Sequence, residues 1–126
     1  MSERPPLAVL LRSGGHDAAH YALVLATTAA ALGRPALVFC TNAGCALLRR
    51  DAPLQADPRE ARLRERGVAT LETLLDAAGE LGVRLIACEA GLRVEAIEAS
   101  ALREDAEVAG AATLLGAAAG GQIVAL

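Results

Sequence analysis

Short apolar runs alternate with longer segments along the chain. Residues 7–11 (LAVLL), 36–40 (ALVFC) and 83–88 (VRLIAC) are mostly apolar and lack the polar alternation of a half-exposed strand. This pattern is typical of strands that are buried on both faces of a sheet. Residues 122–126 (QIVAL) predict a final strand.

The segments between these strands have the length of helices. Residues 16–32 are apolar on nearly all sides and predict a buried helix that Gly33 closes. Residues 105–119 predict the last helix, residues 45–50 one or two helical turns, and residues 89–102 short irregular or helical structure. One amphipathic helix is clear from its i, i+3, i+4, i+7 spacing and the glycine after it. Its markers are Leu71, Leu74, Leu75, Ala78, Leu81 and Gly82.

The order strand, helix, strand predicts an α/β fold. Strands joined by helix-length crossovers run parallel and bury both faces under helices. We therefore expect a three-layer α/β/α sandwich with a mostly parallel sheet of four to five strands, formed by residues 1–126 as a single domain. Residues 51–67 differ, because they hold two prolines, four arginines and four acids. They predict a mobile surface excursion whose arginines form a solvated face balanced by Glu60 and Glu65.

Composition and charge exclude several classes of function. The net charge is −3, and Tyr21 and Phe39 are the only aromatic residues. A nucleic-acid binder needs basic surface and stacking aromatics, so no nucleic-acid partner is expected. The chain has no lysine, which excludes a P-loop nucleoside triphosphatase, a Schiff-base enzyme and a kinase of the usual plan.

Two further features bear on the cellular compartment. Residues 108–126 carry no charge, but Gly120, Gly121 and Gln122 interrupt them. We interpret this run as a helix, a turn and a strand, and expect no membrane span. Three cysteines are too few and too odd in number for a disulfide-stapled secreted domain, and the first residues lack the apolar core of a signal peptide. A cytoplasmic protein with reduced thiols is expected.

Unusual residues follow three of the predicted strands. In a parallel sheet the carboxyl ends of the strands share one edge, where ligands and reactive groups gather. We therefore expect a cleft lined by the residues at these strand exits. They are Ser13, Gly14, Gly15 and His16 after the first strand, Cys40, Thr41 and Asn42 after the second, and Cys88 and Glu89 after the third.

Cys88 is the candidate nucleophile. Backbone N–H groups at the start of a following turn or helix lower the pKa of a thiol and favour the thiolate. The alternative is an inert core thiol, since cysteine is often buried. Cys40 and Cys45 are five residues apart, which is not the spacing of a redox or zinc motif, so each is either a core residue or a second cleft thiol.

A metal site is not expected. His16 and His20 are four residues apart and can share a helix face, so that with a nearby cysteine they could bind a metal. We expect instead that His16 lies in the loop near the cleft and that His20 is a helix residue with a local hydrogen bond. The segment Ser13-Gly14-Gly15 matches neither a dinucleotide-binding fingerprint nor a P-loop. We predict neither a metal nor another cofactor.

Several segments resemble the DsrE/DsrF-like sulfur-relay family, nearest to members labelled peroxiredoxin-like. The resemblance covers LRSGGHD, ALVFCTNAGCALL, LLDAAGELGVRLIAC and the final helix and strand. Its most specific part is residues 82–92, similar to the family segment G-V-x-I-x-x-C-x-x-S-M. Gly91 and Leu92 stand where many relatives have Ser and Met.

The resemblance implies a function as well as a fold. Family members are three-layer α/β domains that form trimers or hexamers, and their cysteine carries sulfur as a persulfide. Cys88 would then accept sulfane sulfur from a donor and pass it to an acceptor thiol, the partners being proteins or small thiols. Cys40 or Cys45, if close to Cys88, would resolve the persulfide. The alternative is a non-catalytic oligomeric module that binds a small ligand or anion in the cleft.

Overall fold

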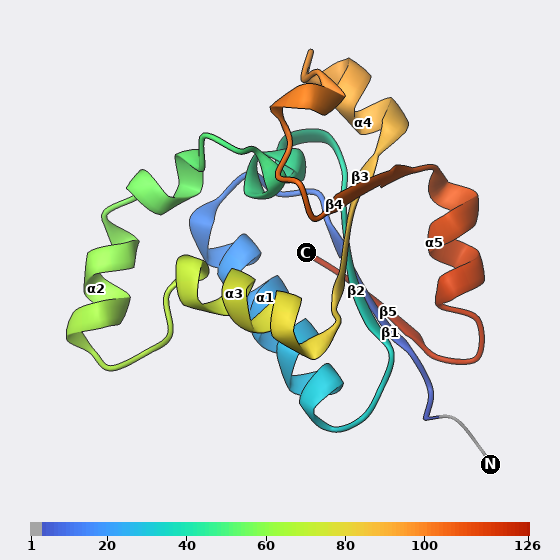
Figure 1. Cartoon of the computed structure of the whole chain (residues 1–126), viewed down its shortest axis with the longest axis horizontal. Coiled ribbons are helices and arrows are strands. Elements are labelled where there is room, and N and C mark those ends of the chain that lie inside the picture. Colours follow the sequence, from blue (N-terminus) through green and yellow to red (C-terminus); the bar gives the residue numbers. More distant parts are fainter. Residues whose placement is uncertain (1–3) are drawn as a thin grey trace.

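The computed structural model describes residues 4–126 and contains one five-stranded sheet (Figure 1). The strand order is β4-β3-β2-β1-β5, and every neighbouring pair is parallel. This confirms the predicted α/β fold. The elements are β1 (Leu7–Leu11), α1 (His16–Ala31), β2 (Ala36–Cys40), η1 (Asn42–Leu48), η2 (Pro53–Ala56), α2 (Arg59–Glu65), α3 (Leu71–Leu81), β3 (Arg84–Cys88), α4 (Glu89–Val94), η3 (Ala99–Ala101), β4 (Ala106–Ala109), α5 (Ala111–Ala117) and β5 (Gln122–Ala125).

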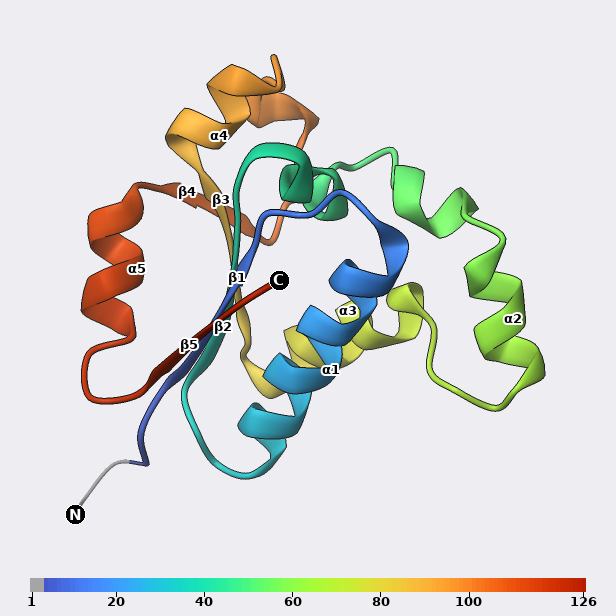
Figure 2. The same cartoon turned by 180° about the vertical axis from the view of Figure 1, so that it is seen from behind.

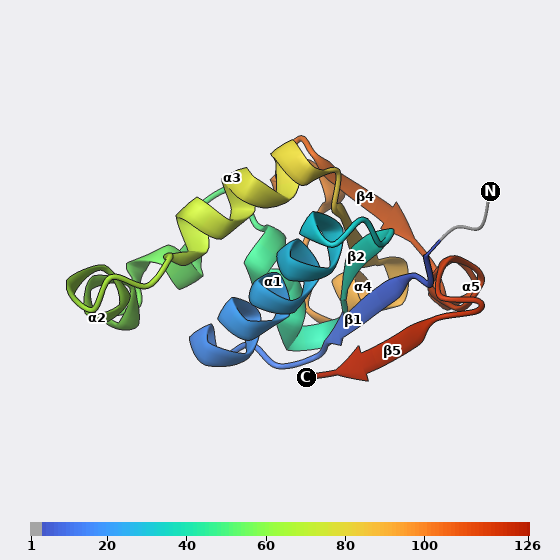
Figure 3. The same ribbon diagram turned by 90° about the horizontal axis from the view of Figure 1, so that it is seen from below.

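Helices cover both faces of the sheet, but unequally. Helices α1 and α3 lie on one face and α5 lies on the other (Figures 2 and 3). The main core forms between the sheet, α1 and α3 from buried aliphatic side chains, among them Leu23, Val38 and Leu75. The α5 side has a smaller cluster built around Phe39, Ile86 and Leu114. The α5 layer is therefore thin.

The central strand is the most completely buried, in line with its prediction as a strand covered on both faces. All five residues of β2 are buried, because β1 and β3 flank it and helices cover both faces. The edge strands β4 and β5 are more exposed, and Val108 and Ile123 present large apolar side chains to solvent.

The segment predicted as one helix over residues 105–119 is divided in two. Residues 106–109 form the strand β4 beside β3, with Cys88 opposite Ala109, and Gly110 precedes α5 in an extended conformation. The alanine-rich sequence favours a helix, but the free edge of β3 offers hydrogen-bond partners to an added strand. This tertiary contact outweighs local helix propensity, which is why the sequence prediction was wrong here.

The segment of residues 51–67 contains η2 and α2. Its predicted mobility stays a prediction. Its four arginines and Glu65 are exposed, as expected of a solvated face. The predicted role of Glu60 at that face is wrong, because Glu60 is only 6% exposed. Its Oε1 accepts hydrogen bonds from His16 Nε2 (2.8 Å) and from the backbone N–H of Leu71 (2.9 Å). A buried carboxylate needs such partners, so Glu60 faces inward while its neighbours face solvent.

Among residues 4–126, no helix has both the length and the hydropathy that a bilayer crossing needs.

Candidate functional site

Three predicted strand exits lie at one edge of the sheet. Leu11 pairs with Cys40 and Cys40 with Ala87, so β1, β2 and β3 end side by side. Strand β3 runs directly into α4 (Figure 1), and Cys88 is the last residue of the strand. The parallel topology thus brings the exits together, as the sequence argument requires.

Helix α4 packs directly against the exit of β2. A Cβ atom on Gly91 would lie 2.5 Å from the backbone nitrogen of Asn42 and 2.6 Å from Thr41 Oγ1. Such an approach is possible only for a residue without a side chain. The backbone of α4 therefore lies close to Thr41, next to Cys88.

Cys88 is the only cysteine that is not buried. Partial burial acts to raise the pKa of its thiol, as does the nearby charge of Glu89 to a smaller extent. The Thr41 hydroxyl and the backbone N–H groups of Gly91 and Ala90 are donors near the sulfur that favour its negative form, and together they hold the pKa of Cys88 below its usual value. The site favours the thiolate, the nucleophilic form of cysteine.

Thr41 has a second acceptor for its single hydroxyl proton. In the structure Thr41 Oγ1 donates to Asn42 Oδ1 at 2.8 Å. Asn42 has a φ of +50°, a left-handed conformation that asparagine tolerates better than most residues. A negative sulfur is a stronger acceptor than an amide oxygen, so we expect the hydroxyl to donate to Cys88 instead once the thiolate forms.

The other two thiols have the opposite environment. Cys45 is fully buried, and its pKa is raised to about 11, first by burial and then by the neighbouring Cys88. Its Sγ–H donates to the carbonyl oxygen of Cys40 at 3.5 Å. Burial also raises the pKa of Cys40. Cys45 therefore lies close to both Cys88 and Cys40, and the two buried thiols are protonated at neutral pH.

A cavity of about 340 Å³ opens at Cys88. Its wall comes from α4 and from the junction between β4 and α5. The sequence prediction missed that junction, because it placed residues 105–119 in one helix. The lining residues are Cys88, Glu89, Ala90, Arg93, Gly110 and Ala111. Glu89 is exposed and pairs with Arg93 at 3.4 Å, so it lies at the open rim of the cavity.

The residues predicted after β1 do not line this cavity. Ser13 Oγ accepts a hydrogen bond from the N–H of Gly15, and Gly14 lies against Ala43 of η1. His16 is buried beneath α2, where it donates to Glu60. The structure therefore brings Thr41, Asn42, Cys45 and Glu89 close to Cys88 and leaves His16 in a different environment.

The described part of the chain contains no group of three or more histidine, cysteine or acidic side chains arranged to bind a metal ion. His20 Nε2 donates to the carbonyl oxygen of Ala69 at 2.8 Å, a contact with a distant segment rather than with its own helix turn.

The fold and the strand-end cysteine define a class of protein. A sequence profile of the DsrE/DsrF/DrsH-like family matches residues 3–62 and 59–125, so the chain belongs to this family. The sulfur carrier protein DsrE2 of Allochromatium vinosum is 26% identical over 143 residues, covering 87% of this chain and 90% of that protein. The family membership supports a role in sulfur relay.

Two solved structures share the fold. The protein of unknown function MTH1491 from Methanobacterium thermoautotrophicum has a TM-score of 0.67 at 17% identity and covers 98% of this chain and 100% of its own. The ychN protein from E. coli has a TM-score of 0.68 at 10% identity, with the same coverage of both chains. At these identities the likeness concerns the fold alone.

Proposed function

We propose that this chain is a sulfur carrier that holds sulfane sulfur as a persulfide on Cys88. The observation that carries the proposal is the contrast between the three thiols. Cys88 opens into a cavity and has a lowered pKa, while Cys40 and Cys45 are buried with raised pKa values. Nucleophilic transfer needs a thiolate that a donor can reach.

The loading step needs only a persulfide donor. The Cys88 thiolate attacks the outer sulfur of a donor R–S–SH, so that a new S–S bond forms and the donor S–S bond breaks. The donor leaves as the thiolate R–S⁻, and the product is Cys88–S–SH. Release repeats the exchange: an acceptor thiolate attacks the outer sulfur and Cys88 leaves as a thiolate. No external oxidant or reductant is consumed.

The local hydrogen bonds serve both states of Cys88. The N–H groups of Gly91 and Ala90 stabilise negative charge on Sγ before loading and when Cys88 leaves again. Arg93 and Glu89, paired at the cavity wall, add no net charge near the entering donor. No cofactor takes part in this scheme.

Cys45 lies where a resolving thiol would lie, but its thiol is protonated, whereas a resolving thiol must be ionised to attack. Attack of a Cys45 thiolate on Cys88 Sγ would release HS⁻ and leave a disulfide between the two residues. A pKa of about 11 leaves little Cys45 thiolate at neutral pH. We propose that this slow reaction lets the persulfide persist until an acceptor arrives, as a carrier requires.

The partners follow from this chemistry and from the similar proteins. The carrier would take sulfur from a donor protein or small persulfide and give it to an acceptor thiol, in the cytoplasm. The similarity to DsrE2, a sulfur carrier protein, supports this assignment. We also propose a homo-oligomer, a trimer or hexamer, because the thin α5 layer and the edge strands leave Leu115, Val108 and Ile123 exposed.

Intact mass spectrometry after exposure to polysulfide tests the proposal. The parent is expected to gain sulfur that a reductant removes, and Cys88→Ser is expected to gain none. Cys40→Ser and Cys45→Ser are matched controls and should still load. If Cys88→Ser gains sulfur like the parent, the carrier site is elsewhere. If the folded parent gains none, the protein is not a carrier, and the ligand-binding module becomes the better assignment.

A further inference from the structure

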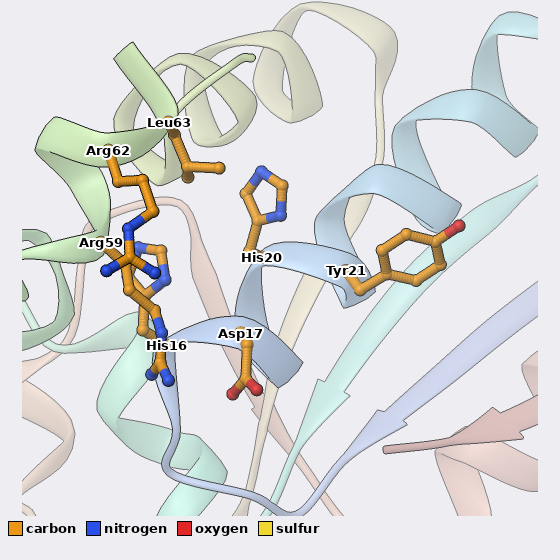
Figure 4. Close-up of a pocket in the computed structure, with 7 residues that line it drawn as sticks. All are labelled: His16, Asp17, His20, Tyr21, Arg59, Arg62 and Leu63. Carbon is orange, nitrogen blue, oxygen red and sulfur yellow. The ribbon is translucent and has the colours of Figure 1, made fainter. Parts of the chain in front are cut away.

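A sulfur donor needs a cavity that reaches a reactive thiol. The cavity between α1 and α2 has no cysteine in its wall, which excludes it from this role (Figure 4). The cavity at Cys88 encloses about 340 Å³. A water molecule takes up roughly 30 Å³ of liquid, so this space holds about eleven water-sized groups. A donor that enters it as a whole is therefore about the size of a single amino acid.

The wall of the Cys88 cavity contains several small residues. Ala90, Gly110 and Ala111 carry no side chain longer than a methyl group. Glu89 and Arg93 are exposed and pair with each other at 3.4 Å, so their charges offset one another. Because neither sign of charge is in excess, the shape of the cavity rather than its charge can select a donor.

Gly110 lies beside the nucleophile on the neighbouring strand. Cys88 of β3 pairs with Ala109 of β4, and adjacent strands lie about 4.8 Å apart. Gly110 is the next residue after this pair and precedes α5. The outer sulfur of a persulfide lies about 2 Å beyond Sγ, and the stem of the donor continues from there. The residue at position 110 is therefore next to the path by which a donor reaches Cys88.

The local structure does not require a glycine at position 110. Its φ is −102° and its ψ is 176°, an extended conformation that any residue adopts. A Cβ atom there would have no heavy atom within 4 Å apart from its chain neighbours, in contrast to Gly91, which packs against Thr41. Serine and threonine cap a helix at least as well as glycine. What the missing side chain of Gly110 provides is open space in the cavity wall.

We propose that Gly110 sets the size limit for the sulfur donor, and that the donor is a low-molecular-weight persulfide of about amino-acid size. This inference rests on the proposed carrier function of Cys88. The donor R–S–SH enters with its stem R against Gly110 and Ala111, gives its outer sulfur to the Cys88 thiolate and leaves as R–S⁻. A side chain at position 110 would take the space of the stem without removing any group that stabilises the thiolate. Gly110 is thus a specificity-determining residue.

Loading of the full chain from donors of increasing size tests this inference. Inorganic polysulfide is a slender chain, cysteine persulfide has an amino-acid-sized stem, and glutathione persulfide has a tripeptide stem. Intact mass spectrometry gives each loading rate, which is divided by the rate of the same donor with free cysteine to remove differences in intrinsic reactivity. The parent is expected to load from polysulfide and cysteine persulfide, and from glutathione persulfide about tenfold more slowly. Gly110→Thr should slow loading from cysteine persulfide about tenfold and loading from polysulfide less than about threefold.

The variants separate a steric effect from a change in folding or protonation. Threonine adds a branched side chain at position 110 and still caps a helix, so circular dichroism should show the variant folded. Gly116→Thr is the matched control, because Gly116 is exposed within α5, has nothing within 4 Å of its Cβ position and does not line the cavity. It should load like the parent. The pH profile of Cys88 alkylation should be the same in both variants as in the parent.

The outcomes distinguish this inference from the carrier function itself. Suppose that the parent loads from polysulfide. Unchanged loading of Gly110→Thr from cysteine persulfide, equal slowing in Gly116→Thr, or equally fast loading of the parent from glutathione persulfide would then overturn the size limit. Loading from polysulfide alone would overturn the assignment of the donor. If the parent gains sulfur from none of the three donors, the carrier function is wrong, and the role of Gly110 is wrong with it.

Discussion

Gly91 and Thr41 lie so close that a Cβ atom on Gly91 would come within 2.6 Å of Thr41 Oγ1. This contact places the first turn of α4 against the end of β2. As a result, the N–H of Gly91 and the hydroxyl of Thr41 both reach the sulfur of Cys88. The absence of a side chain at position 91 is therefore part of how the thiol environment is built.

Gly91→Ala should destabilise the protein. Alanine is ordinarily a better helix former than glycine. Here, however, the new methyl group would clash with the backbone of Thr41 and Asn42, and shifting that backbone costs free energy. We expect a net loss of about 1–3 kcal/mol in the free energy of unfolding. Urea denaturation measures it, and alkylation of Cys88 should slow in the same variant.

Gly79→Ala is the matched control. Gly79 is an exposed glycine within α3, and nothing lies within 4 Å of the position of its Cβ. This variant should gain up to about 1 kcal/mol from helix propensity alone. If both variants were stabilised to a similar degree, α4 would not be packed against Thr41 as described.

Thr41 should control the protonation of Cys88. Thr41→Val keeps the shape but removes the hydroxyl that lowers the pKa of Cys88, so the pKa should rise. The rate of alkylation, followed as a function of pH, should then reach its half-maximum at a higher pH than in the parent. Thr41→Ser keeps the donor and should leave the profile close to that of the parent. Superimposable profiles for parent and Thr41→Val would show that the hydroxyl does not reach the sulfur.

The three cysteines should differ in reactivity at neutral pH. Cys88 is partly exposed with a lowered pKa, whereas Cys45, with a pKa of about 11, and Cys40 are buried. Iodoacetamide with peptide mapping should therefore label Cys88 first and the other two only on unfolding. Equal and slow labelling of all three in the folded protein would remove the basis for assigning Cys88 as the nucleophile.

Self-association should depend on the face that α5 presents. Leu115 is 62% exposed, while the adjacent Leu114 is buried against the sheet. Light scattering at micromolar concentration should give an oligomeric mass for the parent, and Leu115→Glu should lower it by placing a charge in the interface. Arg64→Glu, on the exposed side of α2, is the control and should keep the parent mass. A monomeric parent would remove the proposed oligomer.

The position of Cys88 was predictable because it follows from topology. Apolar runs identify the strands, helix-length crossovers make them parallel, and parallel strands end at one edge. The hydrogen-bond partners of Cys88 were only partly predictable. Thr41 follows a strand and was named, but the closeness of Gly91 to Thr41 depends on how α4 packs, which no local pattern records.

Strand β4 and the burial of Glu60 also could not be predicted, because both depend on contacts with residues far away in the sequence. Residues 106–109 (AEVA) have no strand-like composition and become β4 only because the edge of β3 is free. Glu60 lies in a segment of mixed charge, and nothing local distinguishes it from Glu65, yet one is buried and the other exposed. Its distinguishing partner is His16, which is 44 residues away in the sequence.

Glu60 should contribute far more to stability than Glu65. Removing the Glu60 carboxylate leaves the N–H of Leu71 and Nε2 of His16 buried without their acceptor. We expect Glu60→Ala to cost about 2–5 kcal/mol of the free energy of unfolding. Glu60→Gln keeps an acceptor oxygen and should lose less than Glu60→Ala. Glu65→Ala, in the same helix but exposed, should change stability by less than about 0.5 kcal/mol. Urea denaturation of the three variants gives the comparison, and equal stabilities for Glu60→Ala and Glu65→Ala would show that the buried contact between α1 and α2 does not form in solution.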